Sequence, residues 1–147
     1  MAETGSKPRQ ILQIVLAAVG GAIAALGLVG IVTVPFLLED GFAGGLAILF
    51  FSVHALGGFV LLSVGLLVPQ PTNAGIHFTV GQRKLLTWGT VGPLLSVLGY
   101  LIGINVLPPL SGLVHTVIIG LFVVVLLSGP LATLVAIGLK LRSRRRR

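Results

Sequence analysis

The chain has 147 residues, of which 55% are hydrophobic and only 9% are charged. Soluble domains average about 25% charged residues, so this composition excludes a soluble globular domain and a disordered chain. The absence of cysteine also excludes a disulfide scaffold, a thiolate nucleophile and a cysteine metal site. We therefore expect an all-α integral membrane protein.

Three long stretches without a charged residue mark the predicted spans. They cover residues 10–38, 41–82 and 85–139, and a spanning helix needs about 20 apolar residues. The third stretch has room for two helices, and Pro108 and Pro109 divide it because proline interrupts a helix. The sequence predicts a four-transmembrane-helix bundle in a single domain, residues 1–147, with helices at about 11–38, 41–68, 80–107 and 110–141.

Polar residues at the ends of these stretches predict helix caps. Asp40 precedes the second helix and can accept hydrogen bonds from its first N–H groups. Thr79 and Gln82 fit a capping box at the start of the third helix. The first apolar run continues to Leu38, beyond the roughly 7–15 residues of a signal peptide, so we expect an uncleaved anchor.

The basic residues predict the orientation of the chain. All ten Lys and Arg lie near the N-terminus, at residues 83–84 or at residues 140–147. Four spans place these three segments on one side, whereas Glu39 and Asp40 lie on the other. Because basic residues are enriched on the cytoplasmic side of membranes, we expect both termini in the cytoplasm and the protein in the cell membrane.

The C-terminal tail, residues 140–147, is the densest group of charges. Basic residues near an anionic leaflet are each attracted by about 1 kcal/mol. We therefore expect the tail to bind anionic lipid headgroups, and no motif or aromatic residue in it favours nucleic acid. The predicted membrane-surface residues are Arg142, Arg144, Arg145, Arg146 and Arg147.

Small residues at helical spacing predict the surfaces through which the helices pack. Close backbone approach and interhelical hydrogen bonds drive helix association in lipid. Such surfaces can serve packing within the bundle, a homo-oligomer or a partner membrane subunit. The predicted sets are Ala17, Gly21 and Ala25; Gly41 and Gly45; Gly99 and Gly103; and Ser128, Ala132 and Ala136.

An offset of 73 residues suggests an internal repeat of two helical hairpins. It pairs Gly30 with Gly103 and Pro35 with Pro108, among other matches. Leu and Gly dominate the composition, so chance matches are an open alternative.

His54 is the candidate residue for a bound cofactor. It falls near the middle of the second predicted helix. One reading is a structural imidazole that is hydrogen-bonded to Ser96, Ser52 or a backbone carbonyl. The other is a contact to haem or quinone. His115 falls about seven residues shallower, or about 10 Å, which disfavours a haem held by two histidines.

The sequence leaves three function classes open. The parts of the predicted helices that lie within the uncharged stretches hold no Asp, Glu, Lys or Arg. The sequence predicts no catalytic residue, no metal site and no resident cofactor. The favoured function is a non-enzymatic structural or accessory subunit of a membrane assembly. The alternatives are a small transporter or channel-like protein, with kinks at Pro93 and Pro130 opening a cytoplasmic-side cavity, and a haem- or quinone-associated redox subunit that uses His54.

Overall fold

The computed structural model describes residues 6–38, 41–69, 76–106 and 112–145, and within these ranges all regular structure is helical. The helices are α1 (Ser6–Leu37), α2 (Phe42–Leu67), α3 (Val80–Val106) and α4 (Leu113–Arg145). Each contains a segment long and apolar enough to span a membrane. The chain divides into two compact units at residues 79 and 80, and each is described by itself. The four predicted helices are confirmed.

The largest differences from the predicted bounds lie at the two ends of the chain. Helix α1 begins at Ser6, five residues before the prediction. Pro8 lies in its first turn, where an N–H group is not needed for helical hydrogen bonding. Helix α4 continues to Arg145, past the predicted end at residue 141. Arg and Lys are good helix formers and favour a helix C-terminus, so the basic tail extends the helix.

The residue predicted to cap α2, Asp40, lies outside the described residues, as do Pro108 and Pro109. The N-cap position of the helix is Gly41, which has no side chain that could cap it. Helix α3 begins at Val80, as the predicted cap at Thr79 requires.

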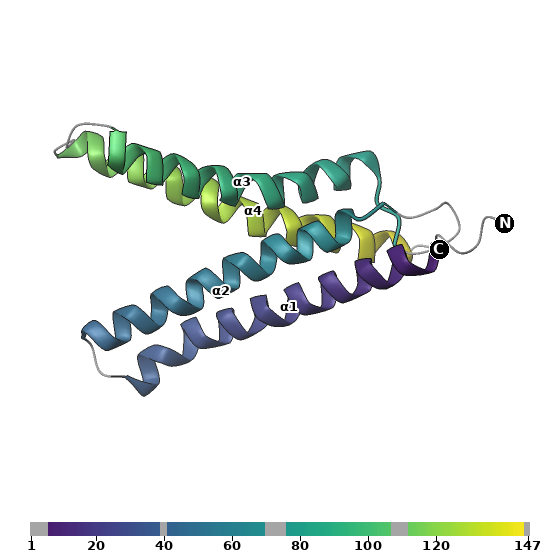
Figure 1. The fold of residues 1–147 in the computed structure, drawn as a ribbon, viewed down its shortest axis with the longest axis horizontal. Helices are drawn as coiled ribbons and strands as arrows, with labels where there is room; N and C mark the ends of the chain where they lie inside the picture. The colour runs from purple at the N-terminus through teal and green to yellow at the C-terminus, as the bar shows by residue number, and fades with distance from the viewer. Residues whose placement is uncertain (1–5, 39–40, 70–75, 107–111, 146–147) are drawn as a thin grey trace. The chain divides into compact units, whose positions relative to one another are not determined.

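Helices α1 and α2 form an antiparallel hairpin whose seam is made largely of glycine and alanine (Figure 1). From Gly20 onward the buried residues of α1 repeat every three or four positions, the spacing of a coiled-coil seam, and Gln13 lies seven positions before Gly20. They are Gln13, Gly20, Ala24, Gly27, Gly30 and Val34. Those of α2 are Gly44, Ala55, Gly58, Phe59, Ser63, Gly65 and Leu66.

The two backbones of this hairpin touch where the glycines meet. A Cβ atom added to Gly58 would lie 2.8 Å from the carbonyl oxygen of Gly20 and 2.7 Å from the Cα of Ala24. A Cβ on Gly65 would lie 2.6 Å from the backbone nitrogen of Ala17. These separations leave no room for a side chain, so glycine is required at both positions of α2.

The small-residue sets predicted for α1 and α2 are wrong except at Ala17, whose backbone lies against Gly65 in the seam. Ala25 is exposed, and a Cβ at Gly21 or at Gly45 would meet nothing within 4 Å. Gly41 is also exposed. Both helices are apolar on every side, so several stripes of small residues could form the seam. The stripe that forms it on α1 includes Gly20 and Gly27, which are seven residues apart.

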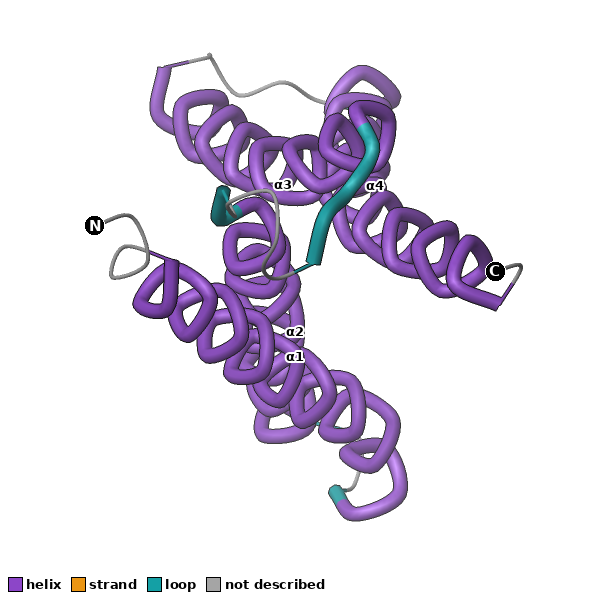
Figure 2. Tube along the Cα trace, turned by 90° about the vertical axis from the view of Figure 1, so that its right-hand side faces the viewer, coloured by secondary structure: helices purple, strands orange, loops and turns teal. Residues whose placement is uncertain are grey.

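Helices α3 and α4 form a second antiparallel hairpin, whose members lie side by side in both views (Figure 2). The stripe predicted on α4 is confirmed for Ala132 and Ala136, which are buried, and Ser128 makes a hydrogen bond to α3. Gly99 contacts the ring of Phe122, whereas Gly103 is partly exposed. The α3 side of the seam buries Gln82, Leu86, Gly89, Gly92, Pro93 and Ser96.

The internal contacts of the first hairpin recur in the second. In α1 and α2, Gly58 meets the Gly20 carbonyl oxygen and Ala24. In α3 and α4, Gly129 meets the Gly89 carbonyl oxygen and Pro93. Residues of α3 thus follow their α1 counterparts by 69 positions, and residues of α4 follow their α2 counterparts by 71.

A second pair of contacts fits the same offsets. The ring of Phe51 covers Gly30, and the ring of Phe122 covers Gly99. Gln13 and Gln82, both buried near the start of their helices, also correspond. The packing therefore supports an internal repeat of hairpins. The register predicted from an offset of 73 is wrong, because two additional residues between α3 and α4 prevent any single offset from matching both helices.

Candidate functional site

His54 lies on the exposed side of α2, near the middle of the helix. Its Nδ1 atom is 2.8 Å from the carbonyl oxygen of Phe50, one helical turn earlier. Of the three structural partners considered from the sequence, the backbone carbonyl is therefore the one found. The Phe50 ring lies 4.1 Å from the imidazole, centroid to centroid, at 40°.

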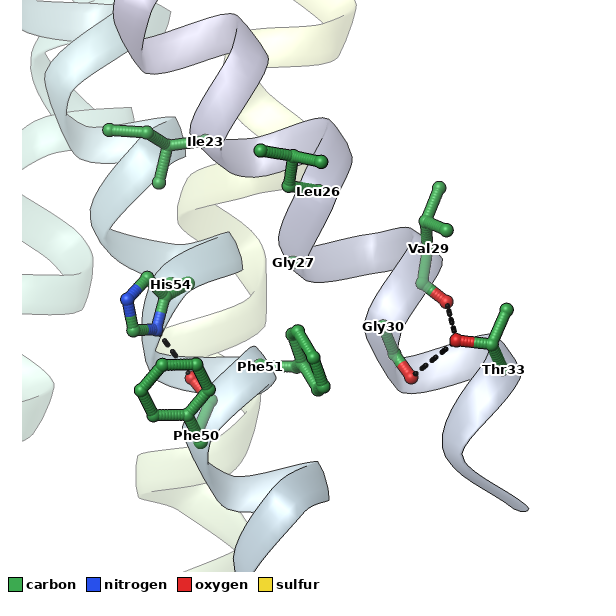
Figure 3. A pocket seen from close by; sticks show the side chains of 9 residues that line it. All are labelled: Ile23, Leu26, Gly27, Val29, Gly30, Thr33, Phe50, Phe51 and His54. Atoms are coloured by element: carbon green, nitrogen blue, oxygen red, sulfur yellow. Dashed lines mark hydrogen bonds between the residues drawn. The ribbon is translucent and has the colours of Figure 1, made fainter. Parts of the chain in front are cut away.

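The imidazole of His54 borders two shallow apolar grooves. The first, about 400 Å³, lies on the α1–α2 hairpin toward the turn between the helices, and Figure 3 shows its lining. The second, about 530 Å³, runs along α2 and shares His54 and Phe50 with the first. The first groove is lined by Ile23, Leu26, Gly27, Val29, Gly30, Thr33, Phe50, Phe51 and His54.

The other polar group of the first groove is already bonded. The hydroxyl of Thr33 donates to the carbonyl oxygens of Val29 at 2.9 Å and Gly30 at 3.3 Å, within its own helix (Figure 3). His54 is therefore the residue of this groove with hydrogen-bonding capacity left for a ligand.

The remaining histidines lie at the ends of helices. His77 precedes α3, and His115 is the third residue of α4, whereas His54 is the thirteenth of α2. In the described residues, no three His, Asp or Glu side chains gather in a way that could hold a metal ion. The candidate site thus consists of a single imidazole on an apolar surface.

The basic tail is helical as far as the structure describes it. Arg142, Arg144 and Arg145 lie exposed in the last turns of α4, and Arg146 and Arg147 fall outside the described residues. At about 100° per residue, these three side chains fall within an arc of about 160° and so share one half of the helix surface.

The two proline-containing segments of the second hairpin are in direct contact. A Cβ on Gly129, beside Pro130, would lie 2.5 Å from the Cδ atom of Pro93 and 3.3 Å from the carbonyl oxygen of Gly89. Gly89 is the residue whose carbonyl loses its helical partner at Pro93. Among the described residues, Pro93 therefore packs against Gly129 of α4. The alternative drawn from the sequence had placed a cytoplasmic-side cavity beside these prolines.

The side chain of Gln13 holds the segment before α3, a contact that was not predicted from the sequence. Its amide nitrogen lies 3.4 Å from the carbonyl oxygen of Ile76, and its amide oxygen lies 3.3 Å from the Ile76 nitrogen. Gln13 is only 1% exposed. The sequence held one signal for the burial of Gln13. It is a polar residue within an apolar run, and it lies seven positions before Gly20 and fourteen before Gly27.

Two interhelical hydrogen bonds hold the second hairpin. The Trp88 indole nitrogen donates to the Ser128 hydroxyl at 2.9 Å, and the Ser96 hydroxyl donates to the Phe122 carbonyl oxygen at 2.6 Å. Ser128 in turn donates to the Val125 carbonyl oxygen at 2.7 Å. Trp88 is thus a packing residue between α3 and α4.

A scan of protein-family models, a search of curated proteins and a search of solved structures each gave no match to the chain.

Proposed function

We propose that the protein is a non-enzymatic structural or accessory subunit of a membrane assembly, located in the cell membrane. The observation that carries this proposal is the contrast between the seams and the outer surfaces of the hairpins. Each seam is closed by backbone contacts at glycine, and Ser63 and Thr133 are fully buried and bonded to their own helices. The outer surfaces present mainly large apolar side chains, which suit lipid or partner helices.

The exposed aromatic residues at the turn of the first hairpin support a protein partner. Phe36 and Phe42 are 85% and 84% exposed, on the two helices that meet at this turn. Aromatic side chains are enriched in the centres of protein interfaces. A partner helix that packs against both rings would make close van der Waals contacts with them, one of the interactions that hold helices together in lipid.

Native mass spectrometry after purification in mild detergent tests this proposal. We expect a defined complex with another membrane protein or with further copies of the chain, and we expect Phe36→Ala with Phe42→Ala to weaken it. Leu26→Ala with Val32→Ala, which truncates exposed residues elsewhere on α1, is the matched control. A monomer carrying lipid alone would contradict the proposal, and solute flux through liposomes would favour the transporter class.

The proposed subunit has both termini in the cytoplasm. The support is the placement of every Lys and Arg in the N-terminal segment, at residues 83–84 and in the tail. Reporter fusions after Arg147 and within the first loop, at Asp40, should report opposite sides of the membrane. A reporter at the C-terminus that is active outside the cell would contradict this orientation.

A further inference from the structure

The hydrogen bond of His54 fixes which ring nitrogen is available. A carbonyl oxygen can only accept, so the Nδ1 atom that lies 2.8 Å from the Phe50 carbonyl carries the proton. In an imidazole that carries one proton, the other ring nitrogen is an acceptor. The Nε2 atom therefore has a free lone pair, and it lies on the side of the ring away from that bond (Figure 3).

This lone pair has no partner among the described residues of its own hairpin. Within α1, α2 and the segment 76–79, no described group donates to His54. His54 is the thirteenth of 26 residues in α2, so it lies about 18 Å from either end of the helix. With α2 spanning a hydrocarbon core of about 30 Å, this depth lies beyond the reach of water and lipid headgroups.

The fold does not require a histidine at this position. Under the 71-residue correspondence between α2 and α4, the counterpart of His54 is Val125. The second hairpin makes the same glycine and phenylalanine contacts with valine there. Packing therefore leaves the presence of an imidazole unexplained, and a ligand explains it.

The surroundings of Nε2 restrict the chemistry of this ligand. It must donate a hydrogen bond at mid-membrane depth, so it must dissolve in hydrocarbon. It must be uncharged, because neither α1 nor α2 has an ionised side chain at this level. It must fit an apolar groove of about 400 Å³ beside the ring of Phe50, which favours a flat aromatic headgroup. Phospholipids and sterols do not satisfy the first condition, because their hydroxyl groups stay at the interface.

We propose that this surface binds the headgroup of a quinol, a hydroquinone with an apolar tail. A ring hydroxyl donates to Nε2 of His54, the ring lies against Phe50, and the tail follows exposed apolar residues such as Leu46 and Leu49, which line the second groove. The quinol is bound and not transformed, and its binding does not depend on the protein being a subunit of an assembly.

The full-length chain in lipid nanodiscs, with ¹⁵N-labelled histidine, provides the test. Titration with decylubiquinol should shift the Nε2 resonance of His54 saturably and leave His77 and His115 unchanged. Decylubiquinone has a similar shape but no ring hydroxyl, so it should bind about 3- to 10-fold more weakly, the range expected for loss of one hydrogen bond.

A pair of variants separates ligand binding from folding. His54→Val installs the residue of the second hairpin and should weaken quinol binding by the same factor without changing the unfolding transition. His115→Val is the matched control and should bind as the unmutated chain does. Because the resonance of the unmutated chain is itself a readout, poor folding of a variant leaves the proposal testable.

Several outcomes would overturn the proposal. One is equal affinity for the quinol and the quinone. Another is an Nε2 resonance already hydrogen-bonded in ligand-free nanodiscs, which would mean that a protein group supplies the donor. A Soret absorption band in the purified protein that is lost in His54→Val would assign the imidazole to haem iron instead.

Discussion

Adding one methyl group to Gly58 should separate α1 from α2, whereas adding it to the neighbouring Gly57 should not. A Cβ at Gly58 would lie 2.8 Å from the carbonyl oxygen of Gly20, and ordinary contacts begin at about 3.5 Å. The helices would have to part by at least about 0.7 Å, because the backbone of Ala24 lies closer still. At Gly57 the added atom would meet nothing within 4 Å.

The expected magnitude follows from overpacking of a closely packed interface, which typically costs about 1–3 kcal/mol. Replacing glycine by alanine also favours a helix by up to about 1 kcal/mol. Both variants share that gain, so the difference between Gly58→Ala and Gly57→Ala isolates the packing cost. A difference of about 1–3 kcal/mol changes the ratio of closed to open hairpin about 5- to 150-fold.

The assay is unfolding in mixed micelles of mild detergent and SDS, followed by energy transfer between two dyes. The chain has no cysteine, so Ile11→Cys and Val64→Cys, both exposed positions, can carry the dyes without background labelling. Gly58→Ala should lose energy transfer at a lower SDS fraction than Gly57→Ala. Equal transitions for the two variants would refute the assignment of Gly58 to the seam.

Three other expectations follow from contacts described above. Gly129→Val should destabilise the second hairpin by about 1–3 kcal/mol, because the added Cβ would overlap the ring of Pro93. The control Gly138→Val adds its side chain in open space and should leave the stability unchanged; thermal unfolding in detergent compares the two variants. Gln13→Leu removes two hydrogen bonds to Ile76, each worth about 1 kcal/mol, so amide exchange at Ile76 should accelerate about tenfold or more, and unchanged exchange would exclude the contact. Replacing residues 144–147 by serine should weaken binding of the tail peptide to anionic vesicles at low salt and have less effect at high salt, because screening removes much of the attraction; an affinity independent of salt would contradict the electrostatic interpretation.

The sequence was sufficient for the number of helices and insufficient for their seams. Runs of uncharged apolar residues locate the spans because a membrane requires them. The choice between Gly20 and Gly21 as the contact residue could not be made in the same way, because both sides of α1 are apolar and glycine is abundant. Only the period of seven that links Gln13, Gly20 and Gly27 carried this information.

The candidate site was predictable to a similar extent. A histidine is rare within an uncharged apolar stretch, so His54 could be selected as a candidate from the sequence. Its bond to Phe50, which determines the free nitrogen, depends on the side-chain rotamer and could not be predicted. The correspondence with Val125 was also hidden, because the unequal loops between the paired helices shift the register by two residues.

The glycine and alanine seam of α1 and α2 also bears on how this hairpin assembles. Glycine and alanine have no side-chain rotamers to lose, so closing the two helices costs almost no side-chain entropy. The segments that meet are separated by a single short turn, which keeps the loop-closure cost small. The first hairpin is therefore suited to form as soon as its two helices are in the membrane, before the remainder of the chain has been inserted.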